Sequence, residues 1–172
     1  LYRLDPASGR FDSWRHDPAD PGSIAADFVA SLLQDRKGRV WVATVDGGLD
    51  RFDPATGRFE HFRHDPADPS SLSSNRVQAL YEDRAGTLWV GTAAGINRLD
   101  EAADGRIGFR SFGLREGLAA DSIGAILEDG AGPEPGQLWI STTAGLSRFD
   151  PRNWTARNYG AADGLPGGSY FV

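Results

Sequence analysis

Residues 82–100 read EDRAGTLWVGTAAGINRLD, and this stretch decides the fold. An Asp-x-x-Gly turn leads into a short apolar run, Leu88 to Thr92, and a glycine leads into a second run that ends at Asp100. The pattern predicts two strands, each preceded by a tight turn. The chain repeats it, because residues 35–44 read DRKGRVWVAT and residues 138–150 read LWISTTAGLSRFD. The protein is therefore a repeat array.

The spacing of the copies indicates a β-propeller. The repeated tryptophans, 48 and then 50 residues apart, are Trp41, Trp89 and Trp139. The aspartates that close the second run, at intervals of 48, 47 and 50, are Asp5, Asp53, Asp100 and Asp150. A strand-rich, glycine-punctuated period of this length is typical of one four-stranded blade per repeat. We predict an all-β propeller of four-stranded antiparallel blades, with about three and a half blades present.

The repeat phase places every blade in one propeller domain. We predict a half blade at 1–15, whole blades at 28–63, 77–113 and 123–159, and the first strand of another blade at 169–172. The predicted strands are 1–5 and 10–15; 28–34, 40–44, 48–52 and 58–63; 77–82, 88–92, 96–100 and 108–113; and 123–128, 138–142, 146–150 and 155–159. Because the chain lacks methionine and this phase begins and ends inside blades, we expect it to be cut from a longer protein.

Both faces of the tryptophan strand are apolar, as expected for a blade between two neighbours. The residues predicted to lie in the core are Trp41, Trp89 and Trp139, whereas Trp14 and Trp154 fall on outer strands or edges. The residue two positions after each core tryptophan is small, namely Ala43, Gly91 and Ser141, which leaves room for the adjacent blade. A partial ring would leave such a face uncovered at each end, so we expect poor solubility or self-association.

Composition excludes several classes of function. Net charge is −6, from 24 acidic and 18 basic residues without a basic run, which predicts no nucleic-acid partner and no direct membrane contact. The absence of cysteine removes disulfides and thiolate metal sites. No apolar run approaches the roughly 20 residues of a membrane span, and the chain does not start with a secretory leader. The sequence predicts no cofactor.

The connections of a four-strand meander alternate between two faces. One face, the turn face, carries turns such as 53–57 and 83–86. The other, the loop face, carries the turns 44–48, 92–95 and 142–145 and the blade-to-blade loops 15–24, 63–72, 113–118 and 160–168. Most differences between copies fall on the loop face. Because binding sites commonly use variable loops on a rigid scaffold, we expect a ligand there.

The candidate ligand-binding residues lie where the chain enters the innermost strands and the copies differ. They are Asp27, Phe28, Asn75, Arg76, Asp121, Ser122, Ser169 and Tyr170. An aromatic ring beside hydrogen-bonding groups suits the face of a sugar. The alternative is that these residues cap strands and line a wet channel.

Other polar residues recur in register, and their repetition favours structural roles. His16 and His64 share one loop position and His61 lies on an outer strand, so we predict that the three histidines face solvent or cap loops rather than bind a metal. The arginines that recur two residues before the repeated aspartate are Arg3, Arg51, Arg98 and Arg148. For these we predict ion pairs rather than a converging anion site. No catalytic residue and no metal site is predicted.

With the copies aligned, the repeat resembles that of the two-component regulator propeller family, V-x-x-I-x-E-D-x-x-G-x-L-W-I-G-T-x-x-G-L-x-x-F-D-P. The matching residues in one copy are Val77, Leu80, Glu82, Asp83, Gly86, Leu88, Trp89, Val90, Gly91, Thr92, Gly95, Ile96, Leu99 and Asp100. Residues 65–75 resemble the family's Asp-Pro-Ser-Leu-Ser-Asn linker. The resemblance covers essentially the whole chain, and several copies match in register.

The resemblance implies part of a seven-bladed propeller in the periplasmic sensing region of an inner-membrane signalling protein. Such proteins carry a dimerisation module and a hybrid histidine kinase or, in some lineages, a diguanylate cyclase, and many sense carbohydrate breakdown products. The implied partners are an oligosaccharide or other small ligand, the rest of the propeller and the dimerisation module. No kinase motif is present in these 172 residues, so we expect a non-enzymatic segment.

Two other functions stay open. The chain could be a protein-interaction scaffold, or a lyase or glycosidase propeller. The turn 83–86 resembles the Asp-box of sialidases, but that box is itself structural, and no tyrosine nucleophile with a partner carboxylate can be placed. Virginiamycin-type lyases have similar repeats but need a histidine directed at the channel, and the histidines here fall at peripheral positions.

Overall fold

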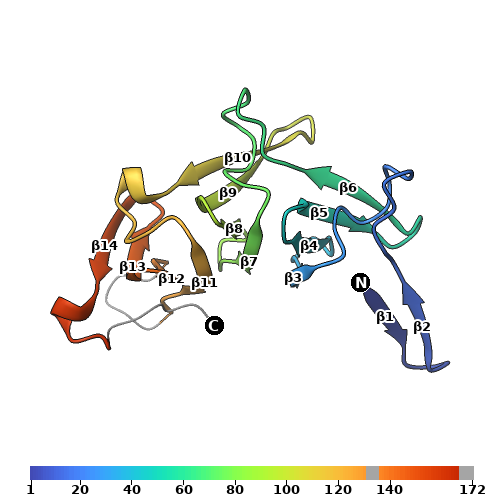
Figure 1. Ribbon diagram of the computed structural model, residues 1–172, viewed down its shortest axis with the longest axis horizontal. Helices are drawn as coiled ribbons and strands as arrows, with labels where there is room; N and C mark the ends of the chain where they lie inside the picture. The colour runs from blue at the N-terminus through green and yellow to red at the C-terminus, as the bar shows by residue number, and fades with distance from the viewer. Residues whose placement is uncertain (131–135, 167–172) are drawn as a thin grey trace.

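The described part of the chain forms antiparallel sheets set side by side in an arc (Figure 1). The structure, a computed structural model, describes residues 1–130 and 136–166. A two-stranded sheet, blade 1, is followed by three four-stranded sheets, blades 2 to 4. The prediction of an all-β propeller arc is thus confirmed. The strand predicted at 169–172 lies outside the described residues.

The observed strand bounds differ from the predicted ones by at most two residues. Blade 1 consists of β1 (Tyr2–Asp5) and β2 (Arg10–Ser13), and blade 2 of β3 (Val29–Gln34), β4 (Val40–Thr44), β5 (Gly48–Asp53) and β6 (Arg58–Phe62). Blade 3 consists of β7 (Val77–Glu82), β8 (Leu88–Thr92), β9 (Gly95–Glu101) and β10 (Ile107–Phe112). Blade 4 consists of β11 (Ile123–Glu128), β12 (Leu138–Thr142), β13 (Gly145–Asp150) and β14 (Thr155–Tyr159). Two short 3-10 helices are η1 (Leu114–Glu116) and η2 (Ala161–Asp163).

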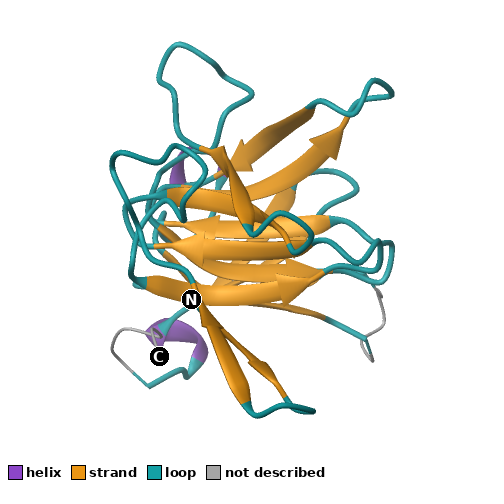
Figure 2. Cartoon of the chain, turned by 90° about the vertical axis from the view of Figure 1, so that its right-hand side faces the viewer, coloured by secondary structure: helices purple, strands orange, loops and turns teal. Residues whose placement is uncertain are grey.

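Each whole blade is a meander in which sequential strands pair. The first strands, β3, β7 and β11, follow the concave side of the arc, and the last strands, β6, β10 and β14, follow the convex side (Figure 1). The turns and loops gather at the two ends of the strands (Figure 2). Each first strand also shifts register by one residue near its start, for example between Val77 and Ala79. Such bulges redirect the chain where it leaves the loop face.

The core consists of apolar layers between neighbouring blades. Trp89 lies in the layer that blade 3 shares with blade 4, whereas Leu88 and Val90 lie in the layer shared with blade 2. Side chains that alternate along one strand therefore serve two interfaces. The small residue after the tryptophan is required, because a Cβ on Gly91 would lie 2.7 Å from Cγ2 of Ile123 in blade 4.

The predicted core tryptophans are buried in two of the three copies. Trp41 is 0% exposed and Trp89 is 1% exposed. Trp139 is only half-buried, which corrects the prediction for that copy. Tyr159 packs on its ring at a centroid distance of 5.4 Å, but within the described residues no further sheet covers the face that carries Trp139. The third layer, between blades 1 and 2, includes Trp14.

The Asp-x-x-Gly turn holds the tryptophan beside it. In blade 3 the indole N–H of Trp89 donates to Asp83 Oδ2 at 2.8 Å, and the amide of Thr87 donates to Oδ1 at 2.8 Å. In blade 2 the Trp41 indole donates to Asp35 Oδ2 at the same distance. The buried indole donor is satisfied in both blades, which explains why six residues separate aspartate and tryptophan in these two copies. In blade 4 the corresponding residues, Asp129 and Trp139, are ten apart.

The glutamate before this aspartate ties the blade to its predecessor. Both carboxylate oxygens of Glu82 accept the backbone N–H of Arg36 in blade 2, at 3.1 Å. Glu128 likewise accepts the backbone N–H of Arg84 in blade 3, at 2.8 Å. The paired acidic residues of the repeat are therefore structural, and the resemblance to an Asp-box needs no catalytic explanation.

Trp14 and Trp154 pack on equivalent phenylalanines by different routes. Trp14 follows the outer strand of blade 1 and lies edge-on to Phe52, with ring centroids 4.8 Å apart. Trp154 comes from the β13–β14 turn of its own blade and lies edge-on to Phe149 at 5.7 Å. It has φ of 58°, at the turn position where Gly57 of blade 2 has φ of 72°. Both tryptophans are half-buried core-edge residues.

Candidate functional site

The blade-to-blade loops approach the innermost strands on the loop face, where we predict the ligand. We call residues 14–28, 63–76 and 113–122 the lead-in loops of blades 2, 3 and 4. Three predicted ligand residues fasten these loops. Asp27 accepts the backbone N–H of His16 at 2.9 Å, Asn75 that of His64 at 2.7 Å, and Asp121 that of Leu114 at 2.6 Å. One side-chain oxygen of each residue therefore already has a structural role, as the alternative interpretation expects.

The other described ligand candidates, Phe28, Arg76 and Ser122, each come directly before the first strand of a blade. Phe28 is 68% exposed, and Arg76 is exposed as well. Ser122 is half-buried and donates a long hydrogen bond, 3.4 Å, to Gln78 of the neighbouring blade. Each thus stands on a different blade along the concave side of the arc. Ser169 and Tyr170 lie outside the described residues, so their placement remains a prediction.

A cavity of about 520 Å³ opens on the loop face of blade 2. Four segments contribute to it: the lead-in loop of blade 2, the β4–β5 turn, the end of β6 and the lead-in loop of blade 3. Among its polar lining residues are His16, Asp46, His61, Arg63 and Asn75. Of the six predicted ligand residues that the structure describes, only Asn75 lines this cavity.

The β4–β5 turn is where blade 2 departs from its copies. Thr44 and Gly48 are separated by three residues, whereas the corresponding turns of blades 3 and 4 have two. Asp46, in the longer turn, is exposed and has φ of 71°, a left-handed conformation that aspartate adopts more readily than most residues with a side chain. Because this longer turn distinguishes blade 2 and places the carboxylate at the loop-face cavity, Asp46 is a functional candidate that the sequence prediction missed.

The side chain of His61 lies beside a fully buried carboxylate. His61 Nδ1 is 2.7 Å from Asp50 Oδ1, and the second oxygen of Asp50 accepts the backbone N–H of Ala25 at 2.8 Å. The other ring nitrogen, Nε2, is 2.9 Å from the Pro21 carbonyl oxygen. The sequence prediction missed this pair, although Asp50 and His61 are cross-strand neighbours in β5 and β6.

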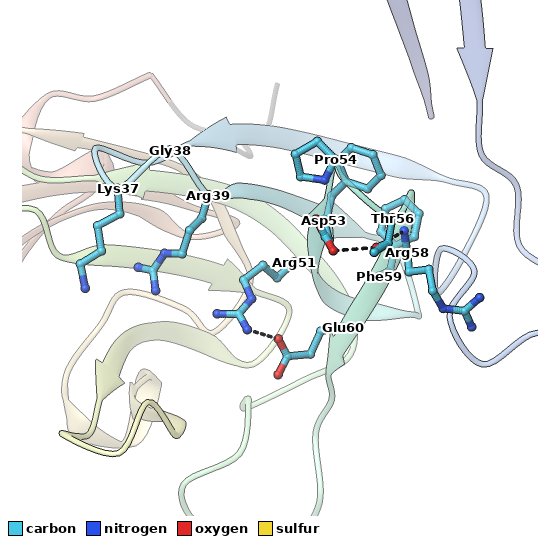
Figure 3. Close-up of a pocket in the computed structure, with 11 residues that line it drawn as sticks. Lys37, Gly38, Arg39, Arg51, Asp53, Pro54, Thr56, Arg58, Phe59 and Glu60 are labelled. Atoms are coloured by element: carbon cyan, nitrogen blue, oxygen red, sulfur yellow. Dashed lines mark hydrogen bonds and ion pairs between the residues drawn. The ribbon is translucent and has the colours of Figure 1, made fainter.

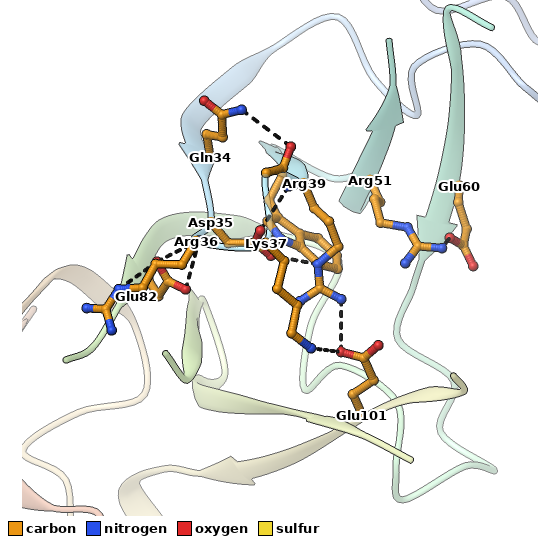
Figure 4. Close-up of polar contacts among 11 residues, drawn as sticks. Gln34, Asp35, Arg36, Lys37, Arg39, Arg51, Glu60, Glu82 and Glu101 are labelled. Atoms are coloured by element: carbon orange, nitrogen blue, oxygen red, sulfur yellow. Dashed lines mark hydrogen bonds and ion pairs between the residues drawn. The ribbon is translucent and has the colours of Figure 1, made fainter. Parts of the chain in front are cut away.

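A second cavity of about 520 Å³ lies on the turn face and carries several cations (Figure 3). Lys37, Arg39 and Arg51 lie along it, from the β3–β4 turn and β5. Each is already neutralised: Lys37 and Arg39 converge on Glu101 at 2.7 and 3.0 Å, and Arg51 pairs with Glu60 (Figure 4). The side-chain hydrogen bond from Lys37 is the main reason that the pKa of Glu101 is lowered.

The recurring polar residues have the structural roles that the sequence predicts. Nδ1 of His16 contacts the Ile24 carbonyl oxygen at 2.9 Å, and Nδ1 of His64 contacts that of Leu72 at 2.6 Å, so both histidines cap loops. The ion pairs of the recurring arginines are Arg3–Asp12, Arg51–Glu60, Arg98–Asp100 and Arg148–Asp129. Within residues 1–130 and 136–166, no group of three metal-ligating side chains converges.

Comparison with known proteins relates these repeats to a family. Residues 23–46 and 71–94 match the family model described as two component regulator propeller, which confirms the resemblance. The segments begin in the lead-in loops of blades 2 and 3 and end in their β4–β5 and β8–β9 turns. No curated protein matches the chain in sequence.

Solved structures extend the relationship to the whole arc. The extracellular domain of BT3049 from B. thetaiotaomicron, described as a hybrid two component system, has a TM-score of 0.72 and 26% identity, over 91% of this chain and 20% of its own. The extracellular domain of BT4673 from that organism, described as a one component system, has a TM-score of 0.72 and 25% identity, over 94% and 22%. The chain thus spans about a fifth of these relatives.

Virginiamycin B lyase from Staphylococcus aureus shares the fold alone. Its TM-score is 0.58 at 14% identity, over 92% of this chain and 47% of the lyase.

The family model and the two extracellular domains together show that the protein is a propeller segment related to the extracellular domains of two component proteins. Among the described residues, no helix has the length and apolar character that crossing a membrane requires.

Proposed function

We propose that this segment belongs to the periplasmic sensing region of an inner-membrane two component protein and binds a small polyhydroxylated ligand, such as an oligosaccharide, on its loop face. The similarity to the extracellular domains of BT3049 and BT4673 supports the location and the signalling role. The rest of the propeller and a dimerisation module would then be its partners within the longer protein.

The observation that carries this proposal is a pair of charged side chains at the loop-face cavity of blade 2, one acidic and one basic, that make no salt bridge. Asp46 and Arg63 are both exposed, and among the described residues neither side chain forms a hydrogen bond or a salt bridge. The amide of Asn75 adds a hydrogen-bond donor beside them. A carboxylate that accepts, with a guanidinium and an amide that donate, matches the vicinal hydroxyl groups of a sugar.

A binding role fits this site better than a catalytic one. The cavity contains an Asp–His pair, but both ring nitrogens of His61 already face protein oxygens, at 2.7 and 2.9 Å. A general base needs a free nitrogen within hydrogen-bond reach of the proton that it removes. We therefore propose that the segment itself is non-enzymatic.

Calorimetric titration of the chain with a panel of neutral and acidic oligosaccharides tests the proposal. Two variants remove the proposed contacts: Asp46→Gly deletes the carboxylate at a backbone conformation that glycine accepts, and Arg63→Gln deletes the charge. We expect each to weaken binding about tenfold or more. Arg10→Gln, an exposed arginine on β2, is the matched control and should bind as the unmodified chain does.

Three results would overturn this proposal. The first is affinity that neither cavity variant changes, which would move any ligand to another site. The second is failure of every oligosaccharide to bind while a protein partner does, which would make the segment a scaffold. The third is turnover of a glycan.

A further inference from the structure

Each whole blade fastens its lead-in loop to a buried polar residue at one position of its third strand. In blade 2 the Ala25 amide donates to Asp50 at 2.8 Å, and in blade 3 the Ser73 amide donates to Asn97 at 2.9 Å. The equivalent contact of blade 4, from the Ala119 amide to the Ser147 hydroxyl oxygen at 3.0 Å, completes the set. The three anchors are fully buried, and only the one in blade 2 is ionisable.

In blades 2 and 4 a second chain of hydrogen bonds connects the anchor to the lead-in loop, through a residue of the outer strand. In blade 4, Ser147 donates to Asn158 at 2.7 Å, and the Asn158 amide donates to the Gly117 carbonyl at 2.9 Å. In blade 2 the same two positions hold Asp50 and His61, and the carbonyl at the far end is that of Pro21. Blade 2 thus has the same arrangement of hydrogen bonds as blade 4, but with two titratable side chains in place of two neutral ones.

The contacts of blade 2 require one specific count of protons. The Pro21 carbonyl can only accept, so His61 Nε2 must carry a hydrogen. A second hydrogen must lie between Nδ1 and Asp50 Oδ1, on either atom. A carboxylate with a neutral imidazole has only one hydrogen for the two contacts. When the pair loses its second proton, one contact sets two acceptors face to face.

The surroundings cut Asp50 off from solvent and leave His61 partly exposed at the cavity. The side chain of Asp50 is 0% exposed and that of His61 is 19% exposed. Burial raises the pKa of Asp50, against the lowering effect of the Ala25 amide and of His61, and the positive charge of Arg63 also lowers it. The other titratable groups around the cavity are His16, Asp17 and Asp20 of the lead-in loop and Asp46 of the β4–β5 turn.

We propose that Asp50 and His61 form a proton-operated clamp on the lead-in loop of blade 2. With two protons on the pair, the loop is held at Ala25 and at Pro21. With one proton, Asp50 retains the N–H of the ring and the tie to Pro21 is lost. The loop that forms one wall of the loop-face cavity therefore loosens as pH rises through the titration of the pair, while blade 4 has no such response. The clamp operates without any ligand.

Amide hydrogen exchange of the chain between pH 5 and 9, corrected for intrinsic rates, tests the clamp. The protection factors of residues 16–25 should fall about five- to tenfold over this range, as expected for one lost hydrogen bond. The lead-in loop of blade 4 is the control within the same molecule, because Ser147 and Asn158 do not titrate. Nitrogen-15 spectra of the His61 ring should show the change in its protonation over the same range.

The double variant Asp50→Ser with His61→Asn gives blade 2 the neutral pair of blade 4, and should abolish the pH dependence while the loop stays protected. Protection of residues 16–25 that stays flat with pH, or that falls in parallel with blade 4, would overturn the clamp. If the double variant does not fold, the comparison of the two loops in the unmodified chain still decides. A chain that binds no sugar leaves this result unaffected, so the two proposals fail separately.

Discussion

The indole of Trp89 donates a 2.8 Å hydrogen bond to Asp83, and both residues are buried. Asp83→Ala removes this acceptor and the acceptor for the Thr87 amide, and leaves two donors without partners. We expect the free energy of unfolding to fall by about 2–4 kcal/mol, measured by urea denaturation with tryptophan fluorescence. Asp104→Ala, at an exposed turn, should unfold close to the unmodified chain. Equal effects of the two changes would contradict the role of the tryptophan contact.

Acid should destabilise the fold through Asp35. Burial alone would raise the pKa of this carboxyl, but hydrogen bonds from Trp41 and Arg39 outweigh it, and its pKa is lowered. The unfolded chain then binds the proton more readily than the folded one. The stabilisation is fully present above the unfolded pKa of about 3.9 and is lost as pH falls through the folded pKa. Unfolding measured from pH 6 to pH 2 should show a shallower loss for Asp35→Asn, and an unchanged slope would count against this assignment.

Trp154 occupies a left-handed turn position that favours glycine. Trp154→Gly relieves about 1 kcal/mol of backbone strain but loses the packing on Phe149, which is worth about 3–5 kcal/mol. We expect a net loss of about 2–4 kcal/mol in urea denaturation. The reciprocal change, Gly57→Ala, places a Cβ 3.2 Å from Trp14 at a φ of 72° and should also destabilise. A more stable Trp154→Gly variant would show that strain outweighs packing there.

One face of blade 4, which no sheet covers within the described residues, should drive self-association. Leu127 is 62% exposed on the strand that pairs with the half-buried Trp139. Sedimentation equilibrium should show a mass that rises with protein concentration, and Leu127→Lys should reduce that rise by placing a charge on the apolar face. Leu114→Lys changes a leucine on η1 that is 53% exposed, and it should not reduce the rise. A chain that remains monomeric at all concentrations would refute the expectation.

The strands could be predicted because turn chemistry and repetition agree. An Asp-x-x-Gly turn before a Leu-Trp run is ambiguous once, but four closing aspartates in register fix the period and the blade boundaries. The burial of each tryptophan could not be predicted equally well. Trp41 and Trp139 both stand second in a five-residue strand that ends in threonine. Within the described residues only Trp41 is covered by a neighbouring blade, and the sequence of a strand does not show what packs against it.

The architecture of the loop face could be predicted, but the contacts of its individual residues could not. The sequence predicts Asp27 and Asn75 as ligand residues because the copies differ there, and in the structure one side-chain oxygen of each also fastens a lead-in loop. The course of a loop decides which amide meets which side chain, and no periodicity encodes that course. The pairing of Asp50 with His61 could not be predicted for a related reason: the two residues meet only once the register of the β5–β6 hairpin is known.

Glu82 and Glu128 join neighbouring blades through backbone amides, and every residue except proline supplies one. The joint therefore places no demand on the side chain that follows the turn aspartate. A duplicated or transplanted blade brings its own glutamate, and this glutamate can accept a backbone N–H from any new neighbour that has no proline at that position. Gene duplication can thus lengthen or reorder such an array without compensating substitutions at this joint, and the loops are left free to diverge toward new ligands.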